Sequence, residues 1–248
     1  MNEPPQKANA NIPQYFAEYL THTDHRLVTK WLHYFEIYQA ELGHLQGRDI
    51  RFLEIGVFMG GSIRMWQGYF GPGSTLIFAD IDPKCAALAE PGTIVEVGDQ
   101  TDPDFLRRLG ETHGPFDVII DDGGHKMDQQ ITSFENLWPL MAATGIYLVE
   151  DTHTSYWPGF GGGYREEASF IEYAKRLVDR MHSWYTDQDD LFPFDAIARE
   201  LGYVRFYDSI VSILKTPRKD PPLTVESVNG KITGNRRVLG IRGRKSVF

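Results

Sequence analysis

Two acidic pairs in the chain each end an apolar run. Asp121-Asp122 follows Phe116–Ile120, Glu150-Asp151 follows Gly145–Val149, and His125 comes three residues after Asp122. Carboxylate oxygens are the ligands that Mg²⁺ and similar divalent cations prefer, and such a cation lowers the pKa of a hydroxyl that it contacts. A histidine, with a reference pKa of about 6.5, can take up the released proton near neutral pH. The two pairs and the histidine therefore predict a metal site with a general base beside it.

Alternating strands and helices would bring these residues together. Apolar runs predict five buried strands, and the segments between them predict helices. Such βαβ units form a mostly parallel sheet whose strands point their carboxyl ends at the ligand crevice. The expected strands are 51–56, 74–80, 93–97, 116–121 and 145–150, and the expected helices are 62–70, 83–88, 103–109 and 128–141. Both acidic pairs then lie at the same edge of the sheet.

The segment before the first strand predicts helical additions to this sheet. Residues 1–11 are polar and are expected to be disordered, and helices are expected at 12–20 and 25–42. Apolar residues recur at helical spacing from Leu27 to Leu42, which indicates packing against the core. Lys30, His33 and Tyr34 lie beside that stripe and could reach a ligand.

The segment after the last strand predicts helices at 166–182 and 194–201, then an antiparallel hairpin of strands 204–207 and 210–214 at the sheet edge. The expected fold is thus α/β, a doubly wound, mostly parallel, seven-stranded Rossmann-like sheet with a C-terminal antiparallel hairpin and added N-terminal helices. The expected divisions are 1–48 for the disordered start and N-terminal helices, 49–216 for the main domain, and 217–248 for a basic C-terminal extension.

A glycine-rich turn follows the first expected strand. Residues 54–62 read Glu-Ile-Gly-Val-Phe-Met-Gly-Gly-Ser, and glycine lets the backbone approach a ligand closely. The G-x-x-x-G-G spacing differs from the G-x-G-x-x-G of dinucleotide sites, and the G-K-[ST] of triphosphate sites is missing. Asp80, at the end of the second strand, can accept hydrogen bonds from ribose hydroxyls, and Gly98-Asp99-Gln100 can read an adenine edge. This ordered set of motifs predicts a binding site for S-adenosylmethionine.

Composition excludes several other classes of protein. The net charge of −9 argues against general nucleic-acid binding, although basic residues gather in the last 18 residues. That basic end indicates a solvated tail or a subunit contact more than an anion site. No apolar window is long enough to span a membrane. The single cysteine, Cys85, excludes an internal disulfide and agrees with the cytoplasm.

The cofactor motifs resemble those of class I S-adenosylmethionine-dependent methyltransferases. The resemblance rests on Leu53-Glu54-Ile55-Gly56 with Gly60, on Phe78-Ala79-Asp80 and on Gly98-Asp99-Gln100. It implies the methyltransferase form of the Rossmann-like fold. The residues expected to hold the cofactor are Glu54, Gly56, Gly60, Ser62, Asp80, Asp99, Gln100 and Asp121.

Asp122-x-x-His125 with Glu150-Asp151, followed by His153-Thr154-Ser155-Tyr156-Trp157, is similar to the metal-dependent sugar O-methyltransferases. That group acts on deoxysugars of macrolide antibiotics. Relatives methylate rhamnose or mannose units of actinobacterial glycans, including mannosides of methylmannose polysaccharide biosynthesis. The resemblance covers residues 51–214. It implies Asp122, Glu150 and Asp151 as ligands of Mg²⁺ or a similar ion, a small-molecule or oligosaccharide acceptor, and a homo-oligomer.

Several assignments remain open between two roles. His125 is expected as the general base, with His153 as the rival base, and His125 could instead ligate the metal or serve the structure. Acidic residues after strands are often helix caps, so Asp122 could be one, and Asp121 is either on the cofactor side or structural. In the loop 152–165, His153, Tyr156 and Trp157 could form a substrate wall, or the loop could pack on the core or on a second subunit.

The expected function is methyl transfer from S-adenosylmethionine to a sugar or glycoside hydroxyl. A catechol-like phenol is the alternative acceptor, because vicinal oxygens would chelate the metal in the same way. The same motifs also fit an enzyme that hydroxylates instead of methylating, or a non-catalytic S-adenosylmethionine-binding module. A nicotinamide dehydrogenase is disfavoured by the glycine spacing.

Overall fold

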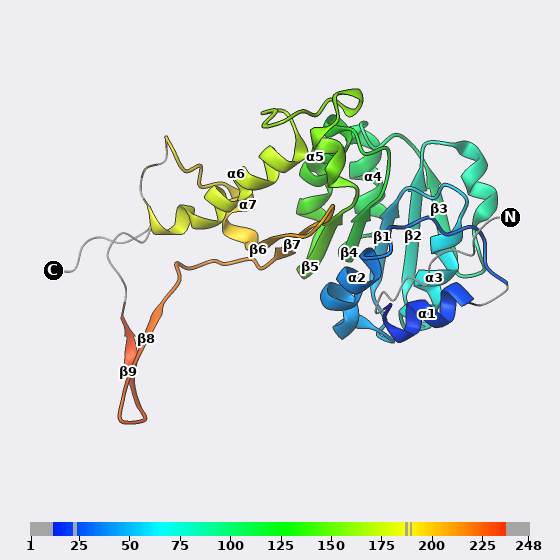
Figure 1. The fold of residues 1–248 in the computed structure, drawn as a ribbon. Coiled ribbons are helices and arrows are strands. Elements are labelled where there is room, and N and C mark those ends of the chain that lie inside the picture. The colour runs from blue at the N-terminus through cyan, green and yellow to red at the C-terminus, as the bar shows by residue number, and fades with distance from the viewer. Residues whose placement is uncertain (1–11, 22–23, 187, 189, 237–248) are drawn as a thin grey trace, which may run out of the picture.

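A seven-stranded sheet forms the centre of the fold in the computed structural model, which describes residues 12–21, 24–186, 188 and 190–236 (Figure 1). The strand order is β3-β2-β1-β4-β5-β7-β6. β7 pairs antiparallel with both β5 and β6, and the other neighbouring strands pair parallel. The strands are β1 (Arg51–Ile55), β2 (Thr75–Asp80), β3 (Thr93–Val97), β4 (Phe116–Asp121), β5 (Met141–Val149), β6 (Leu201–Phe206) and β7 (Val211–Lys215). The expected sheet with its antiparallel hairpin is confirmed.

Helices cover both faces of the sheet (Figure 1). The first face carries α1 (Gln14–Thr21), α2 (Tyr34–Leu42) and α3 (Gly61–Tyr69), and the second carries α4 (Pro103–His113), α5 (Met127–Leu137) and α6 (Phe170–His182). Side chains alternate along a strand, so Phe52 packs with the first group of helices and Leu53 and Ile55 with the second. The doubly wound architecture is therefore confirmed.

Short helical segments complete these layers. They are η1 (Gly43–Leu45), η2 (Pro83–Leu88), η3 (Trp138–Leu140), η4 (Thr152–Tyr156), η5 (Pro158–Phe160), η6 (Ser183–Tyr185) and α7 (Ala196–Glu200). Several helices begin where a side chain caps the free backbone N–H groups. Asp102 does so for α4, Ser169 for α6 and Asp195 for α7. The cap at Ser169 explains why α6 begins at Phe170 and not at residue 166, where the helix was expected.

The long N-terminal helix expected at 25–42 is wrong in its first half. The helix begins at Tyr34, and residues 24–33 form no helix or strand. Phe35, Tyr38 and Leu42 are buried as the stripe predicts, but Leu27 and Trp31 are 59% and 55% exposed. Residues 27 and 28 run directly over Gly61, where an added Cβ would lie 2.0 Å from the carbonyl oxygen of Leu27. The apolar spacing therefore continues into a segment that crosses the glycine-rich turn instead of packing as a helix.

Other boundaries also differ from expectation. The helix expected at 128–141 spans Met127–Leu137 and is followed by η3, and β5 already begins at Met141 instead of residue 145. Pro139 has no N–H for a continued helix, which fits the change to η3. The loop expected at 152–163 contains the two short turns η4 and η5, and most of η4 is buried.

Residues 217–236 contain a second, two-stranded sheet that was not expected. β8 (Thr224–Val228) and β9 (Lys231–Arg236) pair antiparallel around Asn229-Gly230, a residue pair that favours a tight hairpin turn. The hairpin projects from the body of the molecule (Figure 1). The expectations for residues 1–11 and for the basic residues beyond 236 lie outside the described residues. The domain divisions at 48/49 and 216/217 stay predictions.

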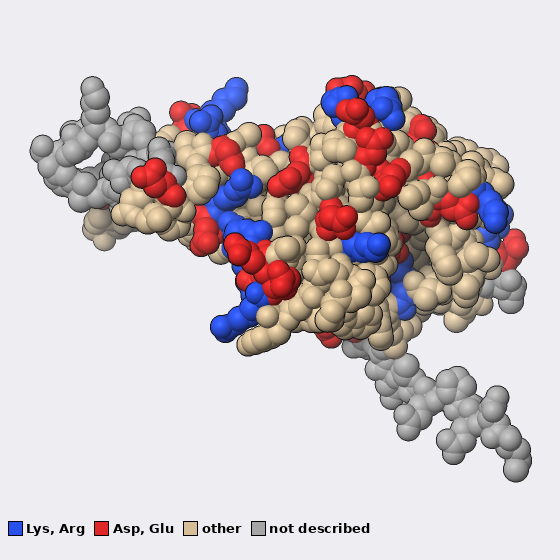
Figure 2. All heavy atoms as spheres, turned by 90° about the horizontal axis from the view of Figure 1, so that it is seen from above, with Lys and Arg blue, Asp and Glu red and all other residues tan. Residues whose placement is uncertain are grey.

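Charge is mixed over the surface seen in Figure 2, where acidic and basic side chains lie interspersed. No helix within the described ranges is long and apolar enough to cross a membrane.

Candidate active site

A cavity of about 390 Å³ lies at the carboxyl ends of β1, β2 and β3, where the cofactor motifs were expected to meet. Gly56, Asp80, Asp99 and Gln100 line it. Glu54, Gly60, Ser62 and Asp121 do not line it. The structure therefore gathers half of the predicted cofactor residues around one cavity, and the other half lies outside its lining.

Gly56 and Asp80 shape the floor of this cofactor-side cavity. Gly56 has φ +99°, and a Cβ there would lie 2.1 Å from the carbonyl oxygen of Asp122, so only glycine fits. The Asp80 carboxylate accepts hydrogen bonds from the backbone N–H groups of Val57 (2.8 Å) and Phe58 (3.1 Å). Burial would raise the pKa of Asp80. The hydrogen bonds from the backbone N–H groups of Asp82, Val57 and Phe58 outweigh the effect of burial and hold the pKa below its ordinary value. Asp80 is thus a fixed carboxylate at the cavity wall.

Glu54 and Ser62 form a buried pair beneath the glycine-rich turn. The Ser62 hydroxyl donates to Glu54 at 2.6 Å, and Trp66 donates to the same carboxylate at 3.3 Å. Glu54 is fully buried. This pair ties β1 to the first turns of α3 and holds the glycine-rich turn between them.

Asp121 is buried between the two predicted sites. It accepts a hydrogen bond from Gln100 at 3.1 Å, and its second carboxylate oxygen has no partner among the described residues. Burial raises the pKa of Asp121 to about 7. Asp121 thus contacts a cavity-lining residue without lining the cavity itself.

A second cavity of about 310 Å³ lies beside the acidic pairs. Its lining includes Lys30, Trp31, Asp122, Glu150 and Asp151. Asp122 lines both this cavity and the cofactor-side cavity. A group held in one cavity and a group held in the other would therefore approach each other at Asp122.

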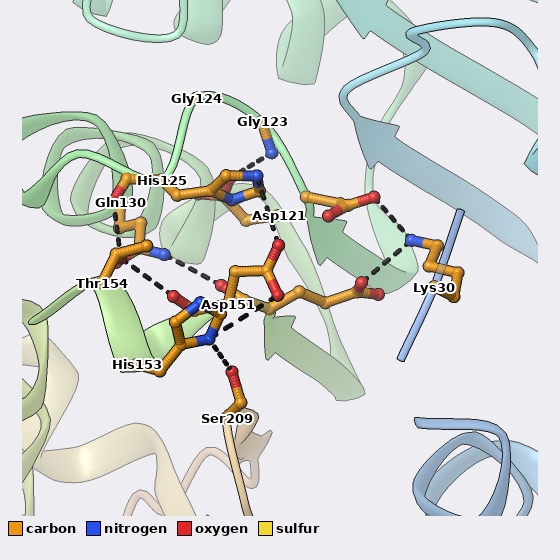
Figure 3. A network of polar contacts seen from close by, with 12 residues as sticks. Lys30, Asp121, Gly123, Gly124, His125, Gln130, Asp151, His153, Thr154 and Ser209 are labelled. Carbon is orange, nitrogen blue, oxygen red and sulfur yellow. Dashed lines mark hydrogen bonds and ion pairs between the residues drawn. The ribbon is translucent and has the colours of Figure 1, made fainter. Parts of the chain in front are cut away.

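Three of the predicted chemical groups form a cluster at this junction. Asp122, His125 and Asp151 each offer a ligand atom within 4.8 Å of the others, a donor set that suits a divalent cation. His125 Nε2 lies 3.4 Å from Asp151 Oδ2 (Figure 3). His125 (φ +57°) and Asp151 (φ +53°) both adopt the left-handed backbone conformation. Such conformations in non-glycine residues gather at functional sites.

The histidine ring is half-buried, and its Nδ1 has no hydrogen-bond partner among the described residues. The carbonyl oxygen of His125 accepts a hydrogen bond from Thr154 at 2.8 Å, which anchors the turn after β4 to η4. This contact positions His125 between the two acidic pairs.

Glu150 is held apart from that cluster. It is fully buried, and its carboxylate accepts hydrogen bonds from Tyr38 at 2.5 Å and Lys30 at 2.9 Å. Burial and the neighbouring Asp122 raise the pKa of Glu150, and Lys30 opposes them. Glu150 therefore lines the second cavity with a carboxylate that already accepts hydrogen bonds from the Lys30 ammonium group and the Tyr38 hydroxyl group.

Lys30 comes from the segment that was expected to be helical. Its Nζ lies 2.6 Å from Asp122, 2.9 Å from Glu150 and 3.4 Å from Glu54. Burial would lower the pKa of Lys30, but Asp122 and Glu150 outweigh it and raise the pKa well above its ordinary value. The sequence indicated only that Lys30 could reach a ligand. It contains no local signal for partners 92 and 120 residues away.

α2 also holds the second acidic pair. The Tyr34 hydroxyl donates to Asp151 at 2.6 Å and lies 2.8 Å from Ser209 Oγ. Ser209, between β6 and β7, is also 2.5 Å from Nδ1 of His153. His153, the rival base, is thus turned toward Ser209, and its Nδ1 is 3.9 Å from Asp151.

Aromatic rings surround His153 beside the second cavity, which Trp31 lines. Trp157 meets it edge-on with ring centroids 4.7 Å apart, and Trp31 does so at 5.9 Å. Trp31, Tyr156 and Trp157 are all about half exposed. The expected substrate residues His153 and Trp157 therefore stand together, and Trp31 joins them although its spacing indicated core packing.

Comparison with known proteins finds methyltransferases among the similar chains. The sequence model of a family described as a methyltransferase domain matches residues 53–152. An 8-demethyl-8-alpha-L-rhamnosyl tetracenomycin-C 2'-O-methyltransferase of Streptomyces olivaceus is 35% identical over 197 residues, which are 75% of this chain and 51% of that protein. An L-olivosyl-oleandolide 3-O-methyltransferase of Streptomyces antibioticus is 38% identical over 199 residues, 74% of this chain and 50% of that protein. The chain spans about half the length of these relatives.

The fold is also found in a solved structure. MycE methyltransferase from the mycinamycin biosynthetic pathway, in complex with Mg and SAH, superimposes with a TM-score of 0.72 and 29% identity. The match covers 84% of this chain and 56% of that one.

Proposed function

Since the chain carries a methyltransferase domain and is a homologue of antibiotic-sugar O-methyltransferases, we propose that it transfers a methyl group from S-adenosylmethionine to a hydroxyl of a sugar or glycoside with the help of a divalent metal. One observation carries the proposal. The cavity built by the glycine-rich turn and the cavity built by the acidic pairs share Asp122.

The cofactor-side cavity is assigned to S-adenosylmethionine. We assign Asp80 to accept hydrogen bonds from ribose hydroxyls, and Asp99 and Gln100 to contact the adenine edge, and all three residues line this cavity. The hydrogen bond between Ser62 and Glu54 braces the glycine-rich turn that contains Gly60, and Asp121 accepts a hydrogen bond from Gln100. MycE, solved with SAH, supports this assignment.

Asp122, Glu150 and Asp151 are assigned as ligands of Mg²⁺ or a similar ion. The carboxylate oxygens of Asp122 and Asp151 lie within 4.8 Å of each other, which supports two of the three ligands, and Glu150 lines the same cavity as both. When bound, the ion lowers the pKa of an acceptor hydroxyl, and S-adenosylmethionine supplies the methyl group. Tyr34 and Tyr38 orient Asp151 and Glu150 through their hydroxyl groups.

His125 is assigned as the general base that takes the proton from the acceptor hydroxyl. Its Nε2 faces the acidic cluster, and Asp151 at 3.4 Å stabilises the imidazolium that forms. His153 is the less suitable base, because it lies outside the cluster that Asp122, His125 and Asp151 form.

The acceptor is assigned to the second cavity and to the aromatic rings beside it. We assign His153, Tyr156 and Trp157 to cover a sugar. The edge-on contact of His153 with Trp157 supports this assignment, because aromatic faces suit the apolar face of a pyranose ring. Named relatives act on sugars attached to tetracenomycin and oleandolide, which favours an antibiotic glycoside over a mannoside of a polysaccharide.

The setting is proposed to be the cytoplasm, with a homo-oligomeric protein. The single cysteine, Cys85, is free and buried, which agrees with a reducing compartment. The projecting β8–β9 hairpin exposes Val225, Val228 and Ile232, apolar side chains that a second copy could cover.

The proposal is tested by methyl transfer from S-adenosylmethionine to a panel of rhamnosides, olivosides, mannosides and catechols, with added Mg²⁺ or a chelator. We expect transfer to a glycoside that stops with the chelator and returns with Mg²⁺. Activity that ignores the chelator would remove the metal from the mechanism. Transfer to catechols alone would replace the sugar as acceptor, and intact cofactor binding without transfer to any acceptor would favour a binding module.

A further inference from the structure

Lys30 places a cation between acidic side chains that the proposed function assigns to a metal. Its ammonium group contacts Asp122 at 2.6 Å and Glu150 at 2.9 Å, and its side chain is only 4% exposed (Figure 3). The third partner, Glu54 at 3.4 Å, belongs to the cofactor side. One lysine thus neutralises carboxylates from both halves of the active site.

The position of Lys30 is built by many contacts. Arg26, four residues earlier, donates to the carbonyl oxygen of Leu88 at 2.5 Å and forms an ion pair with Glu90. Leu27 and Val28 cross Gly61 at a distance that excludes any side chain there. The ring of Tyr38 lies 5.9 Å from the ammonium nitrogen. These contacts fix the segment before α2, so Lys30 is directed at the carboxylates and is not a surface side chain that happens to reach them.

A divalent cation held by Asp122 and Glu150 would have to share these carboxylates with the ammonium group. Two positive charges at contact distance repel strongly in a buried site. The metal therefore either displaces Lys30 from at least one carboxylate or binds against its charge. Without a cation of either kind, buried carboxylates would be left unpaired, which strongly destabilises a folded protein.

We propose that Lys30 is a positioning residue that acts as a built-in counter-ion of the metal site. It holds Asp122 and Glu150 together when the metal is absent, and it competes with the metal for the same carboxylates. This inference rests on the proposed metal site. As a consequence, the metal binds reversibly to a site that is already assembled. The metal-free protein keeps the two halves of the active site joined through the ion pair of Lys30 with Glu54.

The test is Lys30→Met, which keeps most of the side-chain length and removes the charge. We expect the metal-free variant to melt several degrees lower than the wild type, and its melting temperature to rise more on addition of saturating Mg²⁺. Mn²⁺ affinity measured by calorimetry is expected to tighten by about tenfold, because a like charge has been removed from the site. Lys30→Arg keeps the charge, so it is expected to bind Mn²⁺ more weakly than Lys30→Met does. Lys175→Met removes an exposed lysine that pairs with Glu172 at 2.6 Å and serves as the control.

Two results would overturn the inference. Mn²⁺ affinity that is unchanged in Lys30→Met would show no competition. Affinity that weakens by about 10- to 100-fold would show that Lys30 orients the ligands in favour of the metal, as supporting hydrogen-bond partners of metal ligands usually do.

A second variant keeps the test decisive if Lys30→Met does not fold. Lys30→Met combined with Glu54→Gln removes one positive and one negative charge, so the net charge of the cluster is that of the wild type. It is also expected to bind Mn²⁺ more tightly than the wild type, and weaker or equal binding contradicts the inference. Metal affinity is measured without any acceptor, so a failure to find sugar methylation would leave this result independent.

Discussion

The two halves of the active site are assembled in different ways. On the cofactor side, the key groups follow the ends of β1, β2 and β3 within a few residues, and Asp80 is fixed by backbone N–H groups of Val57 and Phe58. On the metal side, groups of the acidic pairs are held by Lys30 and Tyr34, whose partners are 92 to 120 residues away. A strand followed by a tight turn defines the first half. The second half depends on how the segment before α2 lies across the finished sheet.

This contrast predicts that variants of the two halves fail in separate ways, with Asp122 as the point of contact. A metal-side variant should lose turnover and keep the cofactor. A cofactor-side variant should lose the cofactor and keep the metal. A variant of a buried group between the two halves, such as Asp121, should change the stability of the protein more than its turnover or its binding of cofactor and metal.

The largest effect is expected from His125→Ala on the metal side. Turnover should fall by about 10²- to 10⁴-fold, because the acceptor hydroxyl loses its base. S-adenosylmethionine binding, measured by calorimetry, should stay within about twofold of the wild type, because His125 does not line the cofactor-side cavity. His182→Ala removes an exposed histidine at the end of α6 and should change neither value. If His125→Ala turns over at the wild-type rate, another group takes the proton, and His153 is the first candidate.

An intermediate effect is expected from Asp80→Ala on the cofactor side. Loss of the carboxylate at the cavity wall should weaken S-adenosylmethionine binding by roughly 10- to 100-fold, as expected for a hydrogen bond to a charged group and the backbone N–H groups left without an acceptor. Mn²⁺ affinity should be unchanged. Asp104→Ala, which removes an exposed carboxylate near the start of α4, is the matched control. Equal loss of metal and cofactor binding would contradict the separation of the two halves.

The same contrast explains what could be predicted from the sequence. The five parallel strands, the glycine-rich turn and Asp80 were predictable because each depends on local apolar runs and on residues next to them. Both acidic pairs were predictable as neighbours for the same reason, since parallel strands end at one edge. Trp31 was not assigned to the site, because its spacing fits a helical stripe. Lys30 was predicted only as a residue beside that stripe that could reach a ligand. The departure of this segment from a helix depends on its close approach to Gly61. The β8–β9 hairpin was missed, although Asn229-Gly230 carried a local turn signal for it.

The smallest effect is expected from Asp121→Asn, a buried group between the halves. The pKa of Asp121 is about 7 in the folded protein because of burial, and about 3.9 in an unfolded chain. The folded protein therefore keeps a proton that the unfolded chain has lost, and stability falls as the pH rises from about 4 to about 7. Asparagine carries no charge and can still accept the hydrogen bond from Gln100.

Asp121→Asn should thus stabilise the protein at pH 8 by about 1 to 3 kcal/mol, or several degrees in melting temperature, and should be nearly neutral at about pH 4. Thermal melting at several pH values measures the difference. A variant that is destabilised at pH 8 would show that the Asp121 carboxylate is needed in its charged form.

The central claim is a divalent metal held by the acidic pairs, and Mn²⁺ binding followed by electron paramagnetic resonance tests it most directly. The wild type should bind one Mn²⁺ per chain without acceptor or cofactor, and Mg²⁺ should displace it. Asp122→Asn should lose this binding while the cofactor-side cavity still takes S-adenosylmethionine. Equal Mn²⁺ binding by the wild type and Asp122→Asn, or no Mn²⁺ binding by the wild type, would contradict the account.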